Sequence, residues 1–81
     1  MPPGIELSTA PDKALAQAAQ QGCVAAFEEL VRRYQVPLVH FLSRFGGADD
    51  AEDLTQDTFV RAYEKLHLYR DSWQFGAWLF C

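Results

Sequence analysis

The chain has 81 residues, enough for one small domain, and its content of 49% hydrophobic and 14% aromatic residues excludes an intrinsically disordered polypeptide. A net charge of −4 argues against a uniformly basic nucleic-acid binder, because such proteins gain affinity by neutralising phosphates with cations. The two cysteines lack the spacing of a zinc site or a disulfide framework, and neither a signal peptide nor a membrane-spanning run is visible, so we expect a cytoplasmic protein without a membrane partner.

A short first helix is expected after an irregular N-terminal segment. Residues 1–8 hold two prolines and a glycine without any apolar period, so we expect a flexible tail there and one domain over residues 9–81. Thr9 and Asp12 have the spacing of a capping box, which predicts that Thr9 starts an alanine-rich helix. Gly22 is expected to end this helix, because glycine reaches left-handed conformations without a Cβ clash.

The next segment has the clearest helical periodicity. Its apolar residues recur three and four positions apart, which places them on one stripe of a helix. The stripe crosses Pro37 without changing phase and therefore predicts one helix with a kink, ended by Gly46 and Gly47. The stripe consists of Phe27, Leu30, Val31, Tyr34, Leu38, Phe41, Leu42 and Phe45.

A third helix is predicted to begin in an acidic turn. Asp49 and Glu52 have capping-box-like spacing, and carboxylates in a first turn oppose the positive end of the helix dipole. The positions expected to face the core are Ala51, Leu54, Thr58, Phe59, Ala62, Tyr63 and Leu66. The positions expected to point outward or sideways are Asp50, Asp53, Gln56, Asp57, Glu64 and Lys65.

The last part of the sequence predicts a loop and the start of a further helix. The helical period is lost between His67 and Gln74, and Asp71 or Ser72 is expected to cap the helix in which the period resumes at Phe75. Helix-forming residues then continue to the final position without a cap, so we expect the domain to be truncated at its C-terminal end.

Together these segments predict an all-α fold, a small helical bundle of three main helices plus the start of a fourth. No segment shows the period-two alternation that is typical of a strand. The expected core consists of Phe27, Leu30, Val31, Tyr34, Leu38, Phe41, Leu54, Phe59, Ala62, Tyr63 and Trp78.

The chain resembles region 2 of sigma-70 family proteins, and within them the extracytoplasmic-function (ECF) subgroup, through the strings AFEELVRRYQVPLVHFL, DDAEDLTQDTFVRAYEKL and FGAWL. The resemblance runs from about Leu15 to the end of the sequence. It implies a sigma factor domain that binds core RNA polymerase and helps to recognise and melt the minus-ten promoter element in transcription initiation. The basic helix that follows in the family is not part of this sequence, so we expect the fragment to recognise promoters poorly on its own.

The resemblance implies that the third helix binds a coiled coil in the clamp of the polymerase β′ subunit. The family's contact positions correspond to Asp53, Gln56 and Asp57, and we add Asp50 and Arg61 from the same helix. Residues at i, i+3 and i+4 share a helix face, so two carboxylates and an amide there can meet basic side chains together. The alternative for an arbitrary helix is a solvated first turn that only compensates the helix dipole.

The resemblance also implies that the loop before the last helix contacts the non-template strand of promoter DNA and holds an unstacked base. Aromatic rings and nearby cations suit this task, because every base offers a face for stacking. We expect Tyr69, Arg70 and Trp73 to lie on the surface, and the helical spacing of Phe75 with Trp78 and Leu79 favours core positions instead. The candidate DNA-binding residues are Tyr69, Arg70, Trp73, Gln74 and Phe75.

Two other classes of function are weighed against this interpretation. The first is a protein-interaction module that binds an anti-sigma factor or another helical partner without DNA contact; an anti-sigma factor is an expected partner in either case. The second is a metal-dependent hydrolase that uses the acidic group of residues 49–57, but this group lacks the glycine and final glutamate of a calcium loop. We therefore expect no enzyme activity, no cofactor and no metal site.

Overall fold

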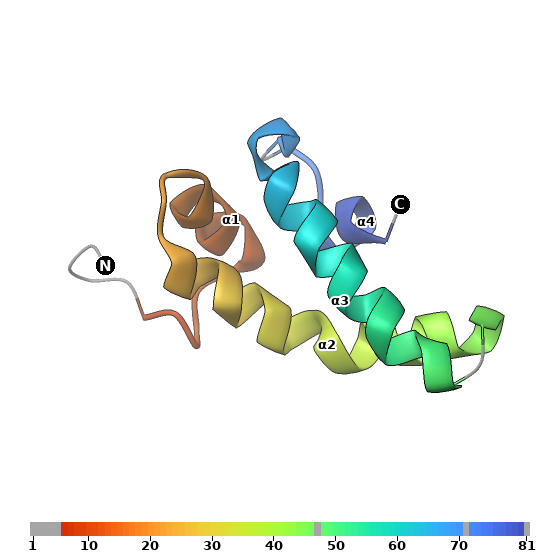
Figure 1. Ribbon diagram of the computed structural model, residues 1–81. Coiled ribbons are helices and arrows are strands. Elements are labelled where there is room, and N and C mark those ends of the chain that lie inside the picture. Colours follow the sequence, from red (N-terminus) through yellow and green to blue (C-terminus); the bar gives the residue numbers. More distant parts are fainter. Residues whose placement is uncertain (1–5, 47, 71, 81) are drawn as a thin grey trace.

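The computed structural model describes residues 6–46, 48–70 and 72–80, apart from the side chains of residues 45–49. Helices connected by short loops make up this part of the chain, and it contains no strand, so the predicted all-α fold is confirmed (Figure 1). The elements are α1 (Asp12–Gln20), α2 (Val24–Gly46), α3 (Ala48–Glu64), the 3₁₀ segment η1 (Leu66–Leu68) and α4 (Phe75–Leu79).

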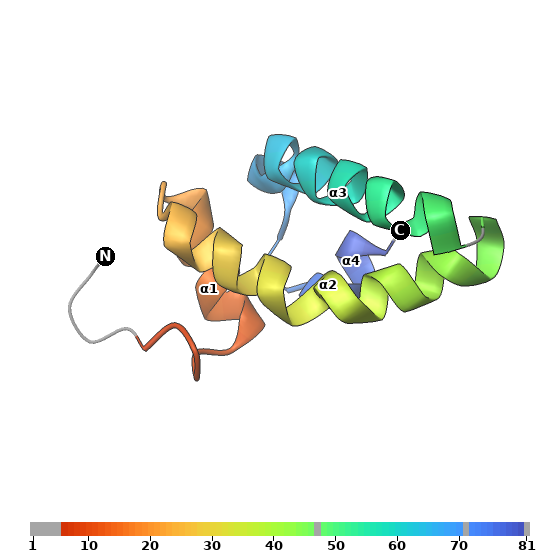
Figure 2. The ribbon, with the colours of Figure 1, turned by 60° about the horizontal axis from the view of Figure 1, so that its bottom comes forward.

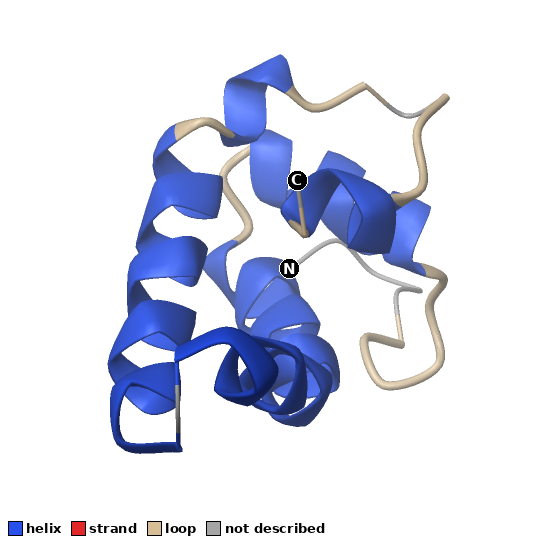
Figure 3. Cartoon of the chain, turned by 90° about the vertical axis from the view of Figure 1, so that its right-hand side faces the viewer, coloured by secondary structure: helices blue, strands red, loops and turns tan. Residues whose placement is uncertain are grey.

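The two long helices α2 and α3 form an antiparallel pair, and the shorter elements pack beside them (Figures 1 and 2). α1 packs against α2, while α4 contacts both α1 and α3. The described residues between η1 and α4, 69–70 and 72–74, lie at the outer edge of the bundle, as Figure 3 shows. The fold therefore brings the N-terminal helix next to the last loop of the chain.

The ends of α1 differ in how well the sequence predicts them. The expected cap at Thr9 is wrong: Pro11 precedes the first helical residue, and the Thr9 hydroxyl donates instead to the carbonyl of Glu6 at 3.4 Å. The stop at Gly22 is confirmed, since Gly22 has a φ of 102°. The N–H groups of Gly22 and Cys23 donate to the carbonyls of Ala19 and Ala18, each at 3.0 Å, in the pattern of a Schellman motif.

α2 continues across Pro37, as predicted, instead of breaking into two helices. Its path changes direction near the middle of the helix (Figure 2), as expected where a proline removes one backbone hydrogen bond and crowds the preceding turn. The helix ends at Gly46, also as predicted. α3 begins at Ala48, and the capping role expected for Asp49 falls on a side chain outside the described residues.

The core is shared by all of the described elements. Phe27, Leu30, Leu38, Phe59 and Ala62 are buried as predicted, and Val31, Tyr34 and Trp78 are partly buried against them. Phe75 and Leu79, for which helical spacing favoured core positions, are buried as well. The buried hydrophobic residues that the sequence did not assign to the core are Leu15, Ala16, Ala19, Ala26 and Tyr69.

Three predicted core residues are exposed, which corrects the predicted orientation of two helices. Phe41 is 38% exposed, Leu54 41% and Tyr63 50%. The buried stripe of α3 includes Ala51, Phe59 and Ala62 as predicted, but it passes through Thr55 instead of Leu54. The Thr55 hydroxyl donates to the carbonyl of Ala51 at 2.6 Å. Because that internal bond satisfies the hydroxyl, a threonine can occupy a buried position for which the sequence made no prediction.

The start of α4 also differs from the prediction. Gln74 occupies the cap position, in an extended conformation and without a side-chain hydrogen bond, so the expected cap at Ser72 is wrong. Asp71, the other expected cap, lies outside the described residues. Phe75 and Leu79 are buried, as their helical spacing predicted.

Candidate functional site

The first candidate surface is the outward face of α3. Asp50, Asp53, Gln56 and Asp57 are all exposed, as the sequence predicted. Within the described part of the chain, none of the three carboxylates forms an ion pair, and the Gln56 amide has no hydrogen-bond partner. Charged and amide groups without internal partners remain available to bind groups from outside the molecule.

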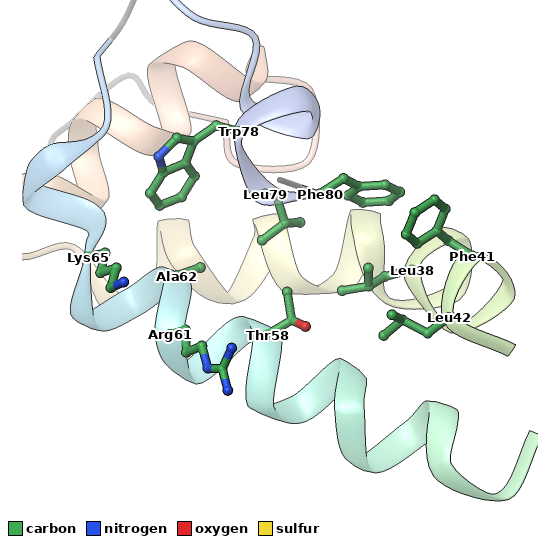
Figure 4. Close-up of a pocket in the computed structure, with 10 residues that line it drawn as sticks. All are labelled: Leu38, Phe41, Leu42, Thr58, Arg61, Ala62, Lys65, Trp78, Leu79 and Phe80. Atoms are coloured by element: carbon green, nitrogen blue, oxygen red, sulfur yellow. The ribbon is translucent and has the colours of Figure 1, made fainter. Parts of the chain in front are cut away.

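Arg61 lies at the C-terminal end of this face. With 100° of rotation per residue, its position is about 40° around the helix from that of Asp57 and about 20° from that of Asp50, but about 140° from that of Gln56. Arg61 lines a hollow of about 250 Å³ together with Lys65, opposite Trp78 of α4 (Figure 4). Arg61 is therefore exposed beside Asp57, and its grouping with the acidic residues stays a prediction.

A groove between α2 and α3 borders Gln56. It measures about 510 Å³, and Val36 and Val39 of α2 form an apolar wall opposite Gln56 and Glu52 of α3. Val36 is exposed, and Phe59 lines the groove from within the core. The groove therefore offers an apolar surface beside a free amide and a free carboxylate, an arrangement that suits an amphipathic helix of a partner.

The second candidate surface is the loop between η1 and α4, where the structure separates the five predicted residues. Arg70, Trp73 and Gln74 are exposed, and Trp73 retains 45% of its surface. The N–H of Trp73 donates to the carbonyl of Arg70 at 2.9 Å. Phe75 is buried, in line with its helical spacing, so it presents no surface to a ligand.

Tyr69 is the main correction in this loop. It is only 4% exposed, and its ring packs against those of Phe75 and Trp78. Its hydroxyl donates to the carbonyl of Trp73 at 2.7 Å. Tyrosine buries its ring readily when the hydroxyl finds a partner, so the expected surface position is wrong and Tyr69 supports the loop from beneath.

Hollows flank Trp73 on two sides. One, of about 300 Å³, lies between the loop and α1 and is lined by Lys13, Tyr34 and Gly76 among others. The other, of about 500 Å³, is lined by Trp73 with Gln74, Ala77 and Trp78 and is largely apolar. An exposed indole with open space beside it can stack on a planar ring, and Lys13 adds a cation at the first hollow.

The contribution of α1 to this surface was missed in the sequence. Lys13 lines the hollow beside Trp73, and the side-chain amide of Gln20 donates to the carbonyls of Leu66 and Tyr69 at the start of the loop. These contacts span 46 and 49 positions of the sequence. No local pattern predicts them, because α1 reaches the loop only through tertiary packing.

A charged network holds α1 and the segment before it on α2. The guanidinium of Arg33 pairs with Asp12 at 2.9 Å and with Glu29 at 3.0 Å. It also donates to the carbonyls of Leu7 and Ser8, in the segment expected to be a tail. The predicted boundary between a flexible tail over residues 1–8 and a domain over residues 9–81 stays a prediction.

Tyr34 extends this network toward α4. Its hydroxyl donates to Asp12, and its ring lies against Phe75, with ring centroids 5.6 Å apart. Burial and then the bond to Asp12 raise the pKa of Tyr34 to about 12. At the other end of the network, hydrogen bonds from Arg32 and Arg33 lower the pKa of Glu29 below its usual value.

The described residues form neither a metal site nor a membrane-spanning helix. No group of three or more His, Cys, Asp or Glu side chains is placed so that it could hold a metal ion. No described helix combines the length and the apolar character that crossing a membrane requires.

Comparisons with known proteins give consistent matches. A family model described as Sigma-70 region 2 matches residues 30–81. The ECF RNA polymerase sigma-E factor of Haemophilus influenzae is 36% identical over 69 residues, and that of Escherichia coli K12 is 35% identical. Each alignment covers 85% of this chain but 36% of the relative, so the chain spans little more than one third of these relatives.

A solved structure matches both the fold and the sequence. It is an NMR structure of an engineered region 2 of sigmaE in complex with GTAAAA, and it superposes with a TM-score of 0.82 at 30% sequence identity. The alignment covers 99% of this chain and 79% of that one. The similarity therefore includes α1, which precedes the residues matched by the family model.

Proposed function

The chain belongs to the sigma-70 family, as a region 2 domain of the ECF subgroup, and from this premise we propose that it docks on core RNA polymerase through α3 and contacts promoter DNA through the loop before α4. The observation that carries the proposal is that the outward side chains of α3 and of this loop form no part of the buried core, although the Trp73 ring also meets that of Tyr69 edge-to-face. Both sets remain exposed while their neighbours pack the core.

The docking surface consists of Asp50, Asp53, Gln56 and Asp57, with the adjoining groove against α2. Its partner is a basic helix of the β′ subunit. Carboxylates on the outer face attract the cations of that helix, and the apolar wall at Val36 and Val39 offers a seat for its apolar side chains. Support comes from the lack of any internal ion pair at these carboxylates in the described structure.

A pull-down of core RNA polymerase with the whole chain tests this surface. We expect Asp53→Arg and Gln56→Ala each to weaken binding roughly ten-fold or more, because each removes or reverses a central polar contact. Circular dichroism should show unchanged helicity, since both side chains are exposed. Glu28→Arg is the matched control, because Glu28 is exposed on α2 and forms no ion pair in the described structure.

The outcome separates this proposal from its alternative. Retained polymerase binding by both α3 variants refutes the docking surface. A protein-interaction module for an anti-sigma factor predicts a different result, in which neither polymerase nor DNA is bound while a helical partner is. No cofactor enters either mechanism.

The DNA surface consists of Arg70, Trp73 and Gln74. Trp73 provides a stacking face for a base of the non-template strand, and Arg70 provides a cation for the phosphates. Support comes from the exposure of both side chains and from the hollows beside Trp73. The engineered relative is described in complex with the oligonucleotide GTAAAA, which is the class of ligand we propose for this chain.

Binding of single-stranded DNA tests the loop. The probe is a hexamer that the wild-type chain enriches from a random single-stranded pool, with GTAAAA as the first candidate. We expect Trp73→Ala to weaken binding by about 1 to 3 kcal/mol, the usual worth of one stacked base, and Trp73→Phe to retain most of it.

Arg70 is tested through the salt dependence of the same binding. We expect Arg70→Ala to reduce the slope of log K against log[salt] by about one phosphate contact. Arg44→Ala is the control, since Arg44 is exposed at the far end of α2. If the wild-type chain enriches no hexamer, or if the loop variants bind as the wild type does, the DNA part of the proposal is wrong.

A further inference from the structure

One side chain of α1 holds the start of the proposed DNA loop. The Nε2 atom of Gln20 lies 3.0 Å from the carbonyl oxygen of Leu66 and 2.8 Å from that of Tyr69. A primary amide carries two N–H donors on one nitrogen, so both are used here. Because both partners are carbonyl oxygens, the nitrogen end of the amide must face them.

The two carbonyls mark the point where η1 gives way to the loop. The N–H of Tyr69 donates to Leu66 at 3.0 Å, which closes the 3₁₀ turn, and the chain becomes extended at Tyr69. A carbonyl oxygen has two lone pairs, so Leu66 can accept a second hydrogen bond beside the one from Tyr69, and the carbonyl of Tyr69 lies beyond the turn; both can therefore accept from a donor outside the segment. Gln20 supplies that donor from a separate helix.

The same anchor is connected to the exposed tip of the loop. The hydroxyl of Tyr69 donates to the carbonyl of Trp73 at 2.7 Å, and the N–H of Trp73 donates to Arg70 at 2.9 Å. Gln20 thus fixes the backbone of Tyr69, and the Tyr69 side chain in turn fixes the backbone that carries Trp73. The position of the indole depends on a residue that belongs to a different element.

We propose that Gln20 is a positioning residue for promoter binding, which makes α1 part of the DNA site although Gln20 itself need not touch DNA. The inference rests on the proposed DNA loop. Its physical basis is preorganisation: a loop that is already held in its binding geometry loses less conformational entropy when a base stacks on it. Removal of the amide should therefore weaken DNA binding more than it weakens the fold, since Gln20 is itself exposed.

Three variants of the whole chain test this inference. Gln20→Met keeps an unbranched side chain of similar length but removes both donors, and Gln20→Lys restores donors on a flexible stem. Gln21→Met is the matched control, because Gln21 is the adjacent exposed glutamine and makes no side-chain bond to the loop. Each is titrated with the enriched DNA hexamer, and amide exchange of residues 70–74 is followed by NMR.

We expect Gln20→Met to bind the hexamer roughly five-fold more weakly, as the loss of two partly exposed hydrogen bonds predicts. Amide exchange should accelerate at Trp73 but not at Gln56, and polymerase pull-down should be unchanged. Gln20→Lys should recover most of the affinity, and Gln21→Met should behave as the wild type does. A general loss of stability would instead weaken polymerase pull-down as well as DNA binding and would accelerate amide exchange at Gln56 as well as at Trp73. Gln20→Lys would not reverse these effects.

Failure of the proposed DNA loop and failure of the inference about Gln20 give different results. If the wild-type chain enriches no hexamer, the proposed DNA loop fails, and the role of Gln20 fails with it. If the wild type binds DNA and Gln20→Met binds equally well, or if its loop amides exchange at the wild-type rate, only the inference about Gln20 is overturned.

Discussion

Gly76→Ala should destabilise the protein although alanine is the better helix former. Gly76 lies in the first turn of α4, and a Cβ atom there would stand 3.1 Å from Cε1 and 3.2 Å from the hydroxyl oxygen of Tyr34. Both distances are shorter than ordinary van der Waals contact, so the Tyr34 ring must move. It has little freedom to do so, because its hydroxyl is bonded to Asp12 and its face packs against Phe75.

Two opposing free energies decide whether Gly76→Ala stabilises or destabilises the protein. Forcing an extra methyl group into a packed site costs typically about 1 to 3 kcal/mol. Replacing glycine by alanine inside a helix gains at most about 1 kcal/mol, and the gain is smaller in a five-residue helix near its first turn. We expect a net loss of about 1 kcal/mol, which corresponds to a decrease in melting temperature of about 4 to 8 °C for a domain of this size.

Urea denaturation followed by far-ultraviolet circular dichroism measures the effect, and a second background isolates its cause. In Tyr34→Leu the ring that meets the new Cβ is gone, so Gly76→Ala should become neutral or stabilising there. A reversal of sign between the two backgrounds identifies the Tyr34 contact as the source of the cost. If Gly76→Ala is as stable as the wild type in the native background, the reasoning is wrong.

Two pH dependences should accompany this network. The pKa of Tyr34 lies at about 12, above the ordinary value of 10.0. The contribution of this raised pKa to stability is therefore complete below pH 10 and is lost as the pH rises through 12. The urea midpoint of the wild type should fall more steeply above pH 10 than that of Tyr34→Phe. The arginine partners of Glu29 lower the pKa of its carboxyl. The contribution of this lowered pKa to stability is therefore present above the ordinary carboxyl pKa and is lost as the pH falls through the folded value. Glu29→Gln should make the urea midpoint depend less on pH in the acid range, and the same acid dependence in variant and wild type would contradict the assignment.

Periodicity predicted the helices better than it predicted which side of each helix is buried. The three-four spacing of α3 fits two overlapping stripes, one through Leu54 and one through Thr55. Only the position of α2 selects between them, and it selects the stripe whose small residues Ala51 and Thr55 allow close approach. A scale that ranks leucine above threonine for burial therefore shifts the predicted stripe toward Leu54, although Ala51, Phe59 and Ala62 are buried as predicted.

The DNA loop shows a second limit of sequence reasoning. Tyr69 and Trp73 are both aromatic residues near Arg70, and nothing local distinguishes them. The structure does so through α1, whose Gln20 holds the backbone of Tyr69 and thereby turns its ring toward the core. Contacts across 46 to 49 positions carry no periodic signal, so this part of the site was not predictable from the sequence alone.

The distribution of charge along α3 reconciles a net charge of −4 with a proposed DNA-binding role. The carboxylates Asp50 and Asp53 lie in its first turns, whereas Arg61 lies near its C-terminal end and Lys65 directly follows it, before the loop with Arg70. Asp50 and Asp53 are separated from Arg61 and Lys65 by about 12 to 22 Å at 1.5 Å per residue, which exceeds the Debye length of about 8 Å at physiological salt. Phosphates near the loop are therefore largely screened from these two carboxylates, so the proposed polymerase and DNA surfaces can be occupied at once.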